Sequence, residues 1–564
     1  MLNRFRFLFA CVAALSVWAC TSPAPPAAKS AILPERPNIL FVVFEDMSPR
    51  IRAYGDSVAT TPVLDAFAAE SVRYTRVFTT AGVCAPSRSA LITGVHQQTL
   101  GTQYMRTRSE VPGIPPGGPI NYDAVPPASV KAFPELLRGA GYYTTNNGKT
   151  DYQFGEPFTI WDEQSTNYPW GGRAEGQPFF AMVNIMTTHE SYLWPTDKPS
   201  DNPLIEYVRQ RNLRDLAGKM QVTDTANVEV PPYLPDTPSV RADIARQYDN
   251  IHFSEAQLAG LLDQLEADGL ADSTIVIVTT DHGDGLPRMK RSIYDSGILV
   301  PMMVRYPDGW GAGSVNEELV SFVDLAPTFL SLAGVNPPDY IQGRVLFGAG
   351  RQAEPEYIYA AMDRHDEVPD RLRAVRDRRW KYIRNYQPDH PFFRHLAFRD
   401  VLPSMQAIWQ AKADGTMPPE LAQYFESSRP EEELYDTETD PDEVVNLAAN
   451  ADNQETLLRL RAAHEAFMSR AGDLSEISES EMVAQMWPGF EQPVTATPEI
   501  MVEGKTVTAS SATEGSSIGY RNVDGEGPWH VYNGPFEAVP GTELIFKAQR
   551  YGYAESAIVT VSVP

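Results

Sequence analysis

Short continuous runs of apolar residues recur along the first 350 positions, separated by more polar segments. Three runs have the length of single strands, residues 39–44, 179–186 and 273–280, and such unbroken apolar character is typical of strands buried on both faces of a sheet. A shorter run at residues 142–146 predicts a further strand. Helical spacing marks parts of the chain between them: residues 62–71, 134–140 and 241–268. This alternation predicts an α/β domain over residues 36–350.

The pattern changes twice after position 350. Residues 351–487 hold more Arg, Asp and Trp; residues 373–385 have the pattern of a β-hairpin, and a helical stretch is expected near residues 452–487. We expect a smaller α+β subdomain here, packed on the first domain. From residue 494 to 564, valines alternate with polar residues and Gly/Pro turns recur. That pattern predicts a small C-terminal β-sandwich.

The N-terminus has the pattern of an export signal. Two arginines precede an apolar run, residues 7–19, which is shorter than the roughly 20 residues that a membrane-spanning helix needs. Cys20 follows a small residue and begins a Pro/Ala-rich stretch, a pattern that resembles a bacterial lipoprotein signal. The resemblance implies that residues 1–19 are a removed signal peptide, that Cys20 carries the lipid and that residues 20–35 are a tether. We therefore expect an exported bacterial lipoprotein, held at the outer membrane or facing the periplasm. An ordinary cleaved signal with an incidental cysteine is the alternative.

Composition narrows the class of protein. The chain has 564 residues, with 47 Lys+Arg against 73 Asp+Glu, for a net charge of −26. This balance argues against a nucleic-acid partner, because phosphate binding depends on clustered Lys and Arg. There are three cysteines, at positions 11, 20 and 84. If the first is removed and the second is acylated, Cys84 is an unpaired thiol in an exported protein, and such a thiol needs an explanation.

Polar residues follow several of the predicted strands. The residues are Glu45, Asp46, Lys149, His189, Asp281 and His282. In open α/β sheets, ligands bind outside the carboxyl ends of strands, so we expect these side chains to converge. Taken singly, each is more often a helix cap or a solvated side chain. Four strand ends with this feature favour a functional site.

The carboxylates in this set indicate a metal ion. Glu45, Asp46 and Asp281 would repel one another and raise each other's pKa if they were packed together without a cation. Oxygen donors favour Ca²⁺ over Zn²⁺. His282 is the exception in the set, because Ca²⁺ prefers oxygen to nitrogen.

Residues 83–94 read Val-Cys-Ala-Pro-Ser-Arg-Ser-Ala-Leu-Ile-Thr-Gly. Cys84 would stand at the start of a helix, where the dipole favours negative charge, although a bare cysteine is more often a buried structural residue. The segment resembles the signature of the type I sulfatases of the alkaline phosphatase superfamily, Cys-x-Pro-Ser-Arg followed by Leu-x-Thr-Gly. Further motifs occur in family-like order between residue 36 and about 450: Thr61-Pro-x-Leu-Asp65, Gly148-Lys149, Asp281-His-Gly283, Tyr294-Asp-Ser-Gly297 and Leu434-Tyr-Asp436.

The resemblance implies an α/β fold with an alkaline-phosphatase-like sheet sandwiched by helices, and the hydrolysis of a sulfate ester. It implies that a maturation enzyme converts Cys84 to formylglycine, whose hydrate is the nucleophile. One Ca²⁺ ion would be held by these residues: Glu45, Asp46, Cys84, Asp281 and His282. Arg88 would hold the formylglycine. Lys149, His189 and Lys290 match the positions that bind sulfate and act on the leaving group.

The sequence departs from the family pattern at three positions. Glu45-Asp46 stands where the family usually has Asp-Asp, and His282 stands where it often has Asn. Asp151 replaces the second histidine of Gly-Lys-x-His. A carboxylate cannot donate a proton at neutral pH unless its pKa is raised, so this change places leaving-group protonation on His189 or Lys290.

The expected substrate is a sulfated polysaccharide or its oligosaccharides. An algal polysaccharide is the first choice, and a host glycosaminoglycan is the second. Arg364 and His365 are candidates for binding the sugar, because Arg suits a second sulfate or a carboxylate. Trp529 and Tyr532 either stack on sugar rings or belong to the core of the β-sandwich. The alternatives are a phosphoesterase or phosphonate hydrolase of the same superfamily, and a non-catalytic lipoprotein that binds sulfated glycans. An intact Cys84 argues against the second, since a binding protein needs no nucleophile.

Overall fold

The computed structural model describes residues 33–108, 117–164, 167–525 and 527–564. The predicted signal peptide, Cys20 and most of the predicted tether lie outside these ranges. Within them, no helix is both long enough and apolar enough to cross a membrane.

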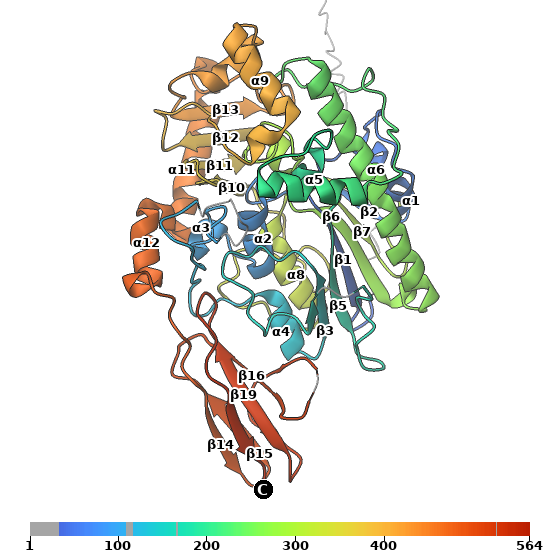
Figure 1. Ribbon diagram of the computed structural model, residues 1–564, viewed down its shortest axis with the longest axis vertical. Helices are drawn as coiled ribbons and strands as arrows, with labels where there is room; N and C mark the ends of the chain where they lie inside the picture. The colour runs from blue at the N-terminus through green and yellow to red at the C-terminus, as the bar shows by residue number, and fades with distance from the viewer. Residues whose placement is uncertain (1–32, 109–116, 165–166, 526) are drawn as a thin grey trace, which may run out of the picture.

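A large mixed sheet forms the centre of the first domain (Figure 1). Its order is β4 (Glu163–Gln164), β3 (Tyr143–Asn147), β5 (Phe179–Ile185), β1 (Asn38–Phe44), β6 (Thr274–Thr280), β7 (Leu299–Arg305), β2 (Val72–Phe78) and β8 (Val315–Asn316), with β9 (Val320–Ser321) paired to β2. Strands β4, β3, β5, β1 and β6 run parallel, and β7 is antiparallel to both β6 and β2. The four strands predicted from apolar runs are all present in the parallel part.

Helices cover both faces of this sheet. The helices of this domain are α1 (Pro62–Ala69), α2 (Cys84–Thr93), α3 (Gln97–Leu100), α4 (Phe133–Gly139), α5 (Pro203–Asp215), α6 (Pro238–Ala267), α7 (Asp295–Ile298) and α8 (Leu325–Leu332). Phe41 and Val43 of β1 share a buried core with α2, α4 and α8. Their neighbours Leu40 and Val42 share another core with α1 and α6. The two faces of β1 are therefore both buried, which explains why its sequence shows no alternation.

The second subdomain has an antiparallel sheet in the order β10 (Ile358–Met362), β11 (Leu372–Arg376), β12 (Trp380–Asn385) and β13 (Glu432–Asp436). Its helices are α9 (Pro403–Asp414), α10 (Pro419–Ala422), α11 (Gln454–Ala471) and α12 (Glu479–Met486). Strands β11 and β12 form the predicted hairpin.

The helical stretch expected near residues 452–487 is wrong as one element, because it is divided into α11 and α12. Gly472, at φ 73° and ψ 163°, ends α11, in a positive-φ conformation that glycine adopts more readily than other residues. Ser478 and Glu481 then form a capping box that starts α12.

The C-terminal region consists of two small sheets. One has the order β14 (Glu499–Glu503), β15 (Thr506–Ser510) and β18 (Phe536–Glu537); the other has β17 (His530–Val531), β16 (Ser517–Asn522), β19 (Glu543–Gln549) and β20 (Val559–Ser562). Val507 and Phe546, one from each sheet, are fully buried in a shared core. This is the predicted β-sandwich, seen at the bottom of Figure 1.

The β-sandwich is fixed to the first domain through a buried polar contact. The Glu135 carboxylate of α4 accepts hydrogen bonds from the Tyr551 hydroxyl at 2.8 Å and from the Ser517 hydroxyl. The Tyr551 ring also stacks on Phe154 with 5.0 Å between centroids. Buried hydrogen bonds of this kind hold two surfaces in one orientation.

The two aromatic residues considered for sugar stacking are engaged within the protein. Trp529 lies at the junction, where its ring contacts Phe158 at 5.5 Å and its carbonyl accepts a hydrogen bond from Arg138. Tyr532 packs into the core of the β-sandwich beside Phe536. Both therefore contribute to packing.

Candidate active site

Four neighbouring parallel strands, in the order β3, β5, β1 and β6, direct polar residues to one edge of the sheet. The residues just beyond their carboxyl ends are Glu45, Asp46, Lys149, His189, Asp281 and His282. Helix α2 begins at Cys84 and adds Cys84 and Arg88 to the same region. The parallel order explains the convergence, because carboxyl ends of parallel strands meet at a shared edge.

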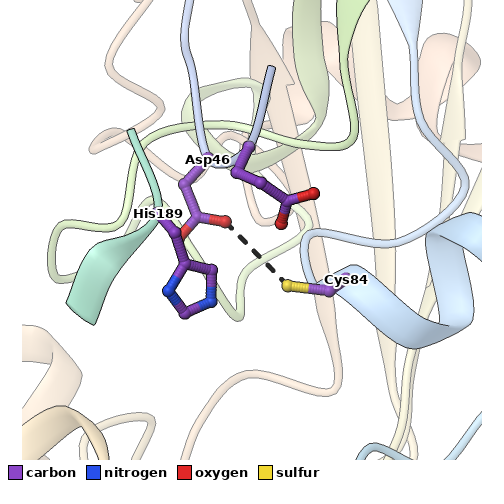
Figure 2. Close-up of side chains that lie close together, drawn as sticks. Asp46, Cys84 and His189 are labelled. Atoms are coloured by element: carbon purple, nitrogen blue, oxygen red, sulfur yellow. Dashed lines mark hydrogen bonds between the residues drawn. The ribbon is translucent and has the colours of Figure 1, made fainter. Parts of the chain in front are cut away.

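The side chains form a compact buried cluster. One ligand atom from each of Asp46, Cys84, Asp281 and His282 lies within 4.8 Å of the others, and the same holds for Glu45, Asp46, Cys84 and His189. The Cys84 Sγ lies 3.2 Å from His282 Nε2 and 3.9 Å from Asp46 Oδ1. Figure 2 shows Asp46, Cys84 and His189 pointing toward one another. Asp46, Asp281 and His282 are fully buried.

Backbone groups hold the Asp46 side chain in place. Asp46 has a left-handed conformation with φ 42°, which Asp tolerates better than most residues. Its amide donates to Asp281 Oδ1 at 3.0 Å, and its carboxylate Oδ2 accepts from the amide of Glu190 at 2.7 Å. The turn after β1 thereby orients the carboxylate of Asp281, and the turn after β5 orients that of Asp46.

Each cation of the cluster is paired with a carboxylate. Arg88 donates from Nε to Asp281 Oδ2 at 3.1 Å and from Nη2 to Glu45. Lys149 Nζ lies 2.5 Å from Glu45 Oε2, and Lys290 Nζ lies 2.7 Å from Asp46 Oδ2. Positive and negative groups are thus interleaved around the thiol, in a setting where burial strengthens their interaction.

Burial and charge set the protonation of three groups. Burial raises the pKa of the Cys84 thiol well above its usual range, so the unmodified thiol stays protonated and is a poor nucleophile. Burial, together with the positive charge of Lys290, holds the pKa of His189 well below its usual value, so its imidazole is neutral. Burial also raises the pKa of Glu45 to about 7, although Arg88 opposes the rise.

The donor set fits a divalent cation. The carboxylate oxygens of Asp46 and Asp281 are closely spaced and buried, with Glu45 beside them, so several oxygen donors face one point. A hard cation such as Ca²⁺ would be held by these oxygens and by the group at position 84, with His282 Nε2 as the nitrogen donor. The predicted ligand residues are therefore all brought together.

Two other predicted residues have different surroundings. Arg364 forms a two-point ion pair with Glu479, 2.7 Å from each carboxylate oxygen, and donates to the carbonyl of Met105. Its guanidinium is thus committed to protein partners. His365 is buried and lies beside a small cavity.

Asp151 adjoins the cluster without joining it. Its carboxylate lies 3.7 Å from Lys149 Nζ and its side chain is 33% exposed. It is therefore a solvated companion of Lys149.

Sequence reasoning missed Asn184 and Glu190. Asn184 lies in β5 and accepts from Arg88 Nη1 at 2.8 Å; its signal was a polar residue inside an apolar run. Glu190 directly follows His189, and both of its carboxylate oxygens accept from Arg291, at 2.6 and 2.8 Å. Only the folded structure shows that Glu190 also approaches Lys290, at 3.6 Å.

Comparisons with known proteins agree with this geometry. The model of the Sulfatase family matches residues 37–173 and 164–335, and the model described as the N-sulphoglucosamine sulphohydrolase C-terminal region matches residues 288–396. The chain is 40% identical to an ulvan-active sulfatase of Formosa agariphila over 94% of its own length and 92% of that protein.

Solved structures share the fold. A 2-O GAG sulfatase aligns with a TM-score of 0.55 at 20% identity, over 78% of this chain and 94% of the other. The phosphonate monoester hydrolase of Agrobacterium radiobacter aligns with a TM-score of 0.50 at 18% identity, over 78% and 96%. Sulfatases and phosphonate monoester hydrolases therefore share this fold. The matches of this chain by sequence are to sulfatases.

Proposed function

The chain belongs to the sulfatase family and is a sulfuric ester hydrolase, and from this premise we propose that it removes sulfate from a sulfated polysaccharide or its oligosaccharides, using a formylglycine derived from Cys84 and one Ca²⁺ ion. The observation that carries the proposal is the Cys84 thiol at the start of α2, enclosed by Asp46 and His282 and protonated by burial. An inert thiol at the focus of this cluster is suited to conversion rather than to direct attack. The ulvan-active relative makes ulvan the first polysaccharide to test.

Formylglycine and Ca²⁺ would supply two chemical functions that the twenty amino acids lack, an aldehyde hydrate and a divalent cation. A hydrated formylglycine would supply one hydroxyl to attack sulfur with loss of the alcohol, and a second whose deprotonation would form the C=O bond as the C–O bond to sulfate breaks, while Ca²⁺ would neutralise charge on the sulfate. The residues that would hold the ion are Glu45, Asp46, Asp281 and His282. Arg88 is placed to orient position 84, because both lie in the first turns of α2 and the guanidinium is anchored at Asp281.

The remaining cations are assigned to the sulfate group. Lys149 and Lys290 are bonded to Glu45 and Asp46, on two sides of the cluster, and both favour negative charge at position 84. Preorganised ammonium groups stabilise charge that develops on the sulfate oxygens and the leaving oxygen.

Protonation of the leaving alcohol is assigned to His189 together with Lys290, with the Lys290 ammonium as the source of the proton because the His189 ring is neutral. The His189 Nε2 lies 3.4 Å from Lys290 Nζ, and its Nδ1 lies 2.8 Å from the Ser191 hydroxyl. The ring is thus held between a proton donor and an orienting hydroxyl. Asp151 is solvated and paired with Lys149, so it is not assigned this step.

The deciding experiment joins a mass measurement to an activity assay. The peptide containing Cys84, from protein made in cells that carry a formylglycine-generating enzyme, should show the thiol replaced by an aldehyde, and this protein should release sulfate from ulvan. Chelation followed by addition of Ca²⁺, Mg²⁺ or Zn²⁺ should restore activity best with Ca²⁺. An unmodified thiol in protein that still releases sulfate would overturn the mechanism, and converted protein that releases phosphate or phosphonate instead would favour the other hydrolase class.

The predicted lipid anchor is kept as a proposal. Labelling of the wild-type protein with a radioactive fatty acid, and its loss in Cys20→Ala, would support an exported lipoprotein. Equal labelling of both forms would contradict it.

A further inference from the structure

A small cavity of about 20 Å³ lies between the catalytic cluster and the second subdomain. Three arginines, Arg291, Arg394 and Arg399, line it together with His365 and Asp370. We call it the arginine pocket. None of these arginines belongs to the cluster around Cys84.

Several donors around the arginine pocket are left without acceptors. The Nε atoms of Arg394 and Arg399 have no hydrogen-bond partner in the described part of the chain, and Arg291 Nε lies 3.5 Å from Asp366 Oδ2. The same is true of both ring nitrogens of His365, whose side chain is only 3% exposed. Buried polar atoms are rarely left unpaired, so a group of them around one cavity points to an acceptor that binds there.

The cations around the arginine pocket are not equally paired. Arg291 is paired with Glu190 and with Asp366, and Arg394 shares Asp370 with Arg429, at 2.9 and 2.7 Å. Among the described residues, Arg399 forms no ion pair with a carboxylate; its Nη2 donates to the carbonyl of Arg394.

Burial lowers the pKa of Arg399 to about 10 and Arg291 adds to the effect, while the negative charges of Asp400, Glu190 and Glu367 oppose it. A buried guanidinium without a carboxylate is unfavourable unless an anion arrives. The missing partner is therefore expected to carry negative charge.

The arginine pocket lies close to the position assigned to the leaving group. Glu190 Oε2 lies 2.6 Å from Arg291 Nη1 and 3.6 Å from Lys290 Nζ, so one carboxylate connects the two regions. Phe398, which precedes Arg399, places its ring 6.4 Å from the ring of His189. A sugar held at His189 would therefore be a near neighbour of the arginine pocket.

We propose that the arginine pocket binds a carboxylate group of the substrate, carried by a uronic acid at or next to the sulfated sugar. The proposal rests on the proposed function and names the substrate class more closely. Guanidinium groups bind planar carboxylates through parallel hydrogen bonds. The cavity has room for a group about the size of a water molecule, so it can take one oxygen atom of such a carboxylate.

The test compares two ligands in a form that cannot turn them over. Binding of a sulfated oligosaccharide containing a uronic acid, and of the same oligosaccharide with its carboxyl group reduced to the alcohol, is measured by calorimetry with the full-length Cys84→Ala protein. We expect the reduced ligand to bind at least ten-fold more weakly. Adding Arg399→Gln should make the two affinities equal, and adding Arg378→Gln, an exposed arginine of the same subdomain, should leave the ratio unchanged.

Each outcome decides the proposal. A ratio of affinities is insensitive to partial loss of folded protein, because both ligands meet the same sample. Equal binding of the two ligands to Cys84→Ala, or an unchanged ratio after Arg399→Gln, would overturn the proposal and leave the pocket to ordered water. A ratio that follows a second sulfate group would assign the pocket to sulfate instead. Failure of the proposed function appears separately, as absence of sulfate release by the formylglycine-containing protein.

Discussion

The catalytic cluster and the arginine pocket adjoin each other but treat buried charge in opposite ways. In the cluster, Arg88, Lys149 and Lys290 each contact a carboxylate at 3.1 Å or less. In the arginine pocket, Arg399 has no such partner among the described residues, and neither ring nitrogen of His365 has a hydrogen-bond partner there. Paired cations suit a site that must be held in one arrangement before substrate arrives, whereas an unpaired cation suits a site completed by the ligand.

The largest expected effect is the loss of activity in Cys84→Ala, which should occur with little change in the stability of the protein. Cys84→Ala should lower sulfate release by about 10⁴-fold or more, because it removes the precursor of the nucleophile. The free energy of unfolding should change by no more than about 1 kcal/mol, since the thiol makes weak contacts. Steady-state kinetics and urea unfolding check both parts. Substantial residual activity would exclude position 84 as the nucleophile.

The next effect compares buried arginines directly. Arg88→Met should destabilise the protein by about 3–5 kcal/mol, because it leaves Glu45 and Asp281 buried without their partner. Arg399→Met should be neutral or stabilising, since it removes a buried charge that has no carboxylate. Urea unfolding of the ligand-free proteins at neutral pH measures both changes. Similar losses in both variants would break the distinction between the two regions.

The sequence predicted the strands of the catalytic cluster but not the arginine pocket. The apolar runs at residues 39–44 and 273–280 became β1 and β6 with ends shifted by at most one residue, because strands buried on both faces need no polar position. The parallel order of those strands brings Asp46 and Asp281 together, as the polar residues at the strand ends indicated.

Partners from distant segments could not be predicted in this way. Arg364 pairs with Glu479, 115 positions away, and a sequence pattern carries no record of such a contact. The missing partner of Arg399 is equally invisible, because it depends on the packing of residues from three segments of the second subdomain and the first domain. Helix α11 ends at Gly472 and α12 begins after Ser478, so these two residues interrupt the helical spacing.

A smaller effect concerns the acid stability of the arginine pocket. Burial, with Arg291 nearby, lowers the pKa of His365 to about 3. Below the ordinary histidine pKa of about 6.5 the unfolded chain binds a proton that the folded protein does not, so the stability contributed by neutral His365 is present at neutral pH and is lost as pH falls. The slope approaches about 1.4 kcal/mol per pH unit near pH 5. In His365→Asn, the fall in unfolding free energy between pH 7 and 5 should be less steep; an equal slope would show that His365 finds a proton acceptor in the folded state.

The smallest effect tests the boundary of the cluster. Asp151 is 33% exposed and lies 3.7 Å from Lys149 Nζ, whose ammonium is already bonded to Glu45 at 2.5 Å. A solvated carboxylate at that distance contributes about 1 kcal/mol or less, so Asp151→Ala should change kcat/KM for ulvan oligosaccharides by less than about five-fold. The pH dependence of kcat should keep its shape, because leaving-group protonation is assigned to His189 and Lys290.

Lys149→Ala provides the matched comparison, with an expected loss in kcat/KM of about 10²–10³-fold. If Asp151→Ala instead abolished the alkaline limb of the pH profile, Asp151 would be the proton donor, and the cluster would extend to a residue that the structure leaves in contact with solvent.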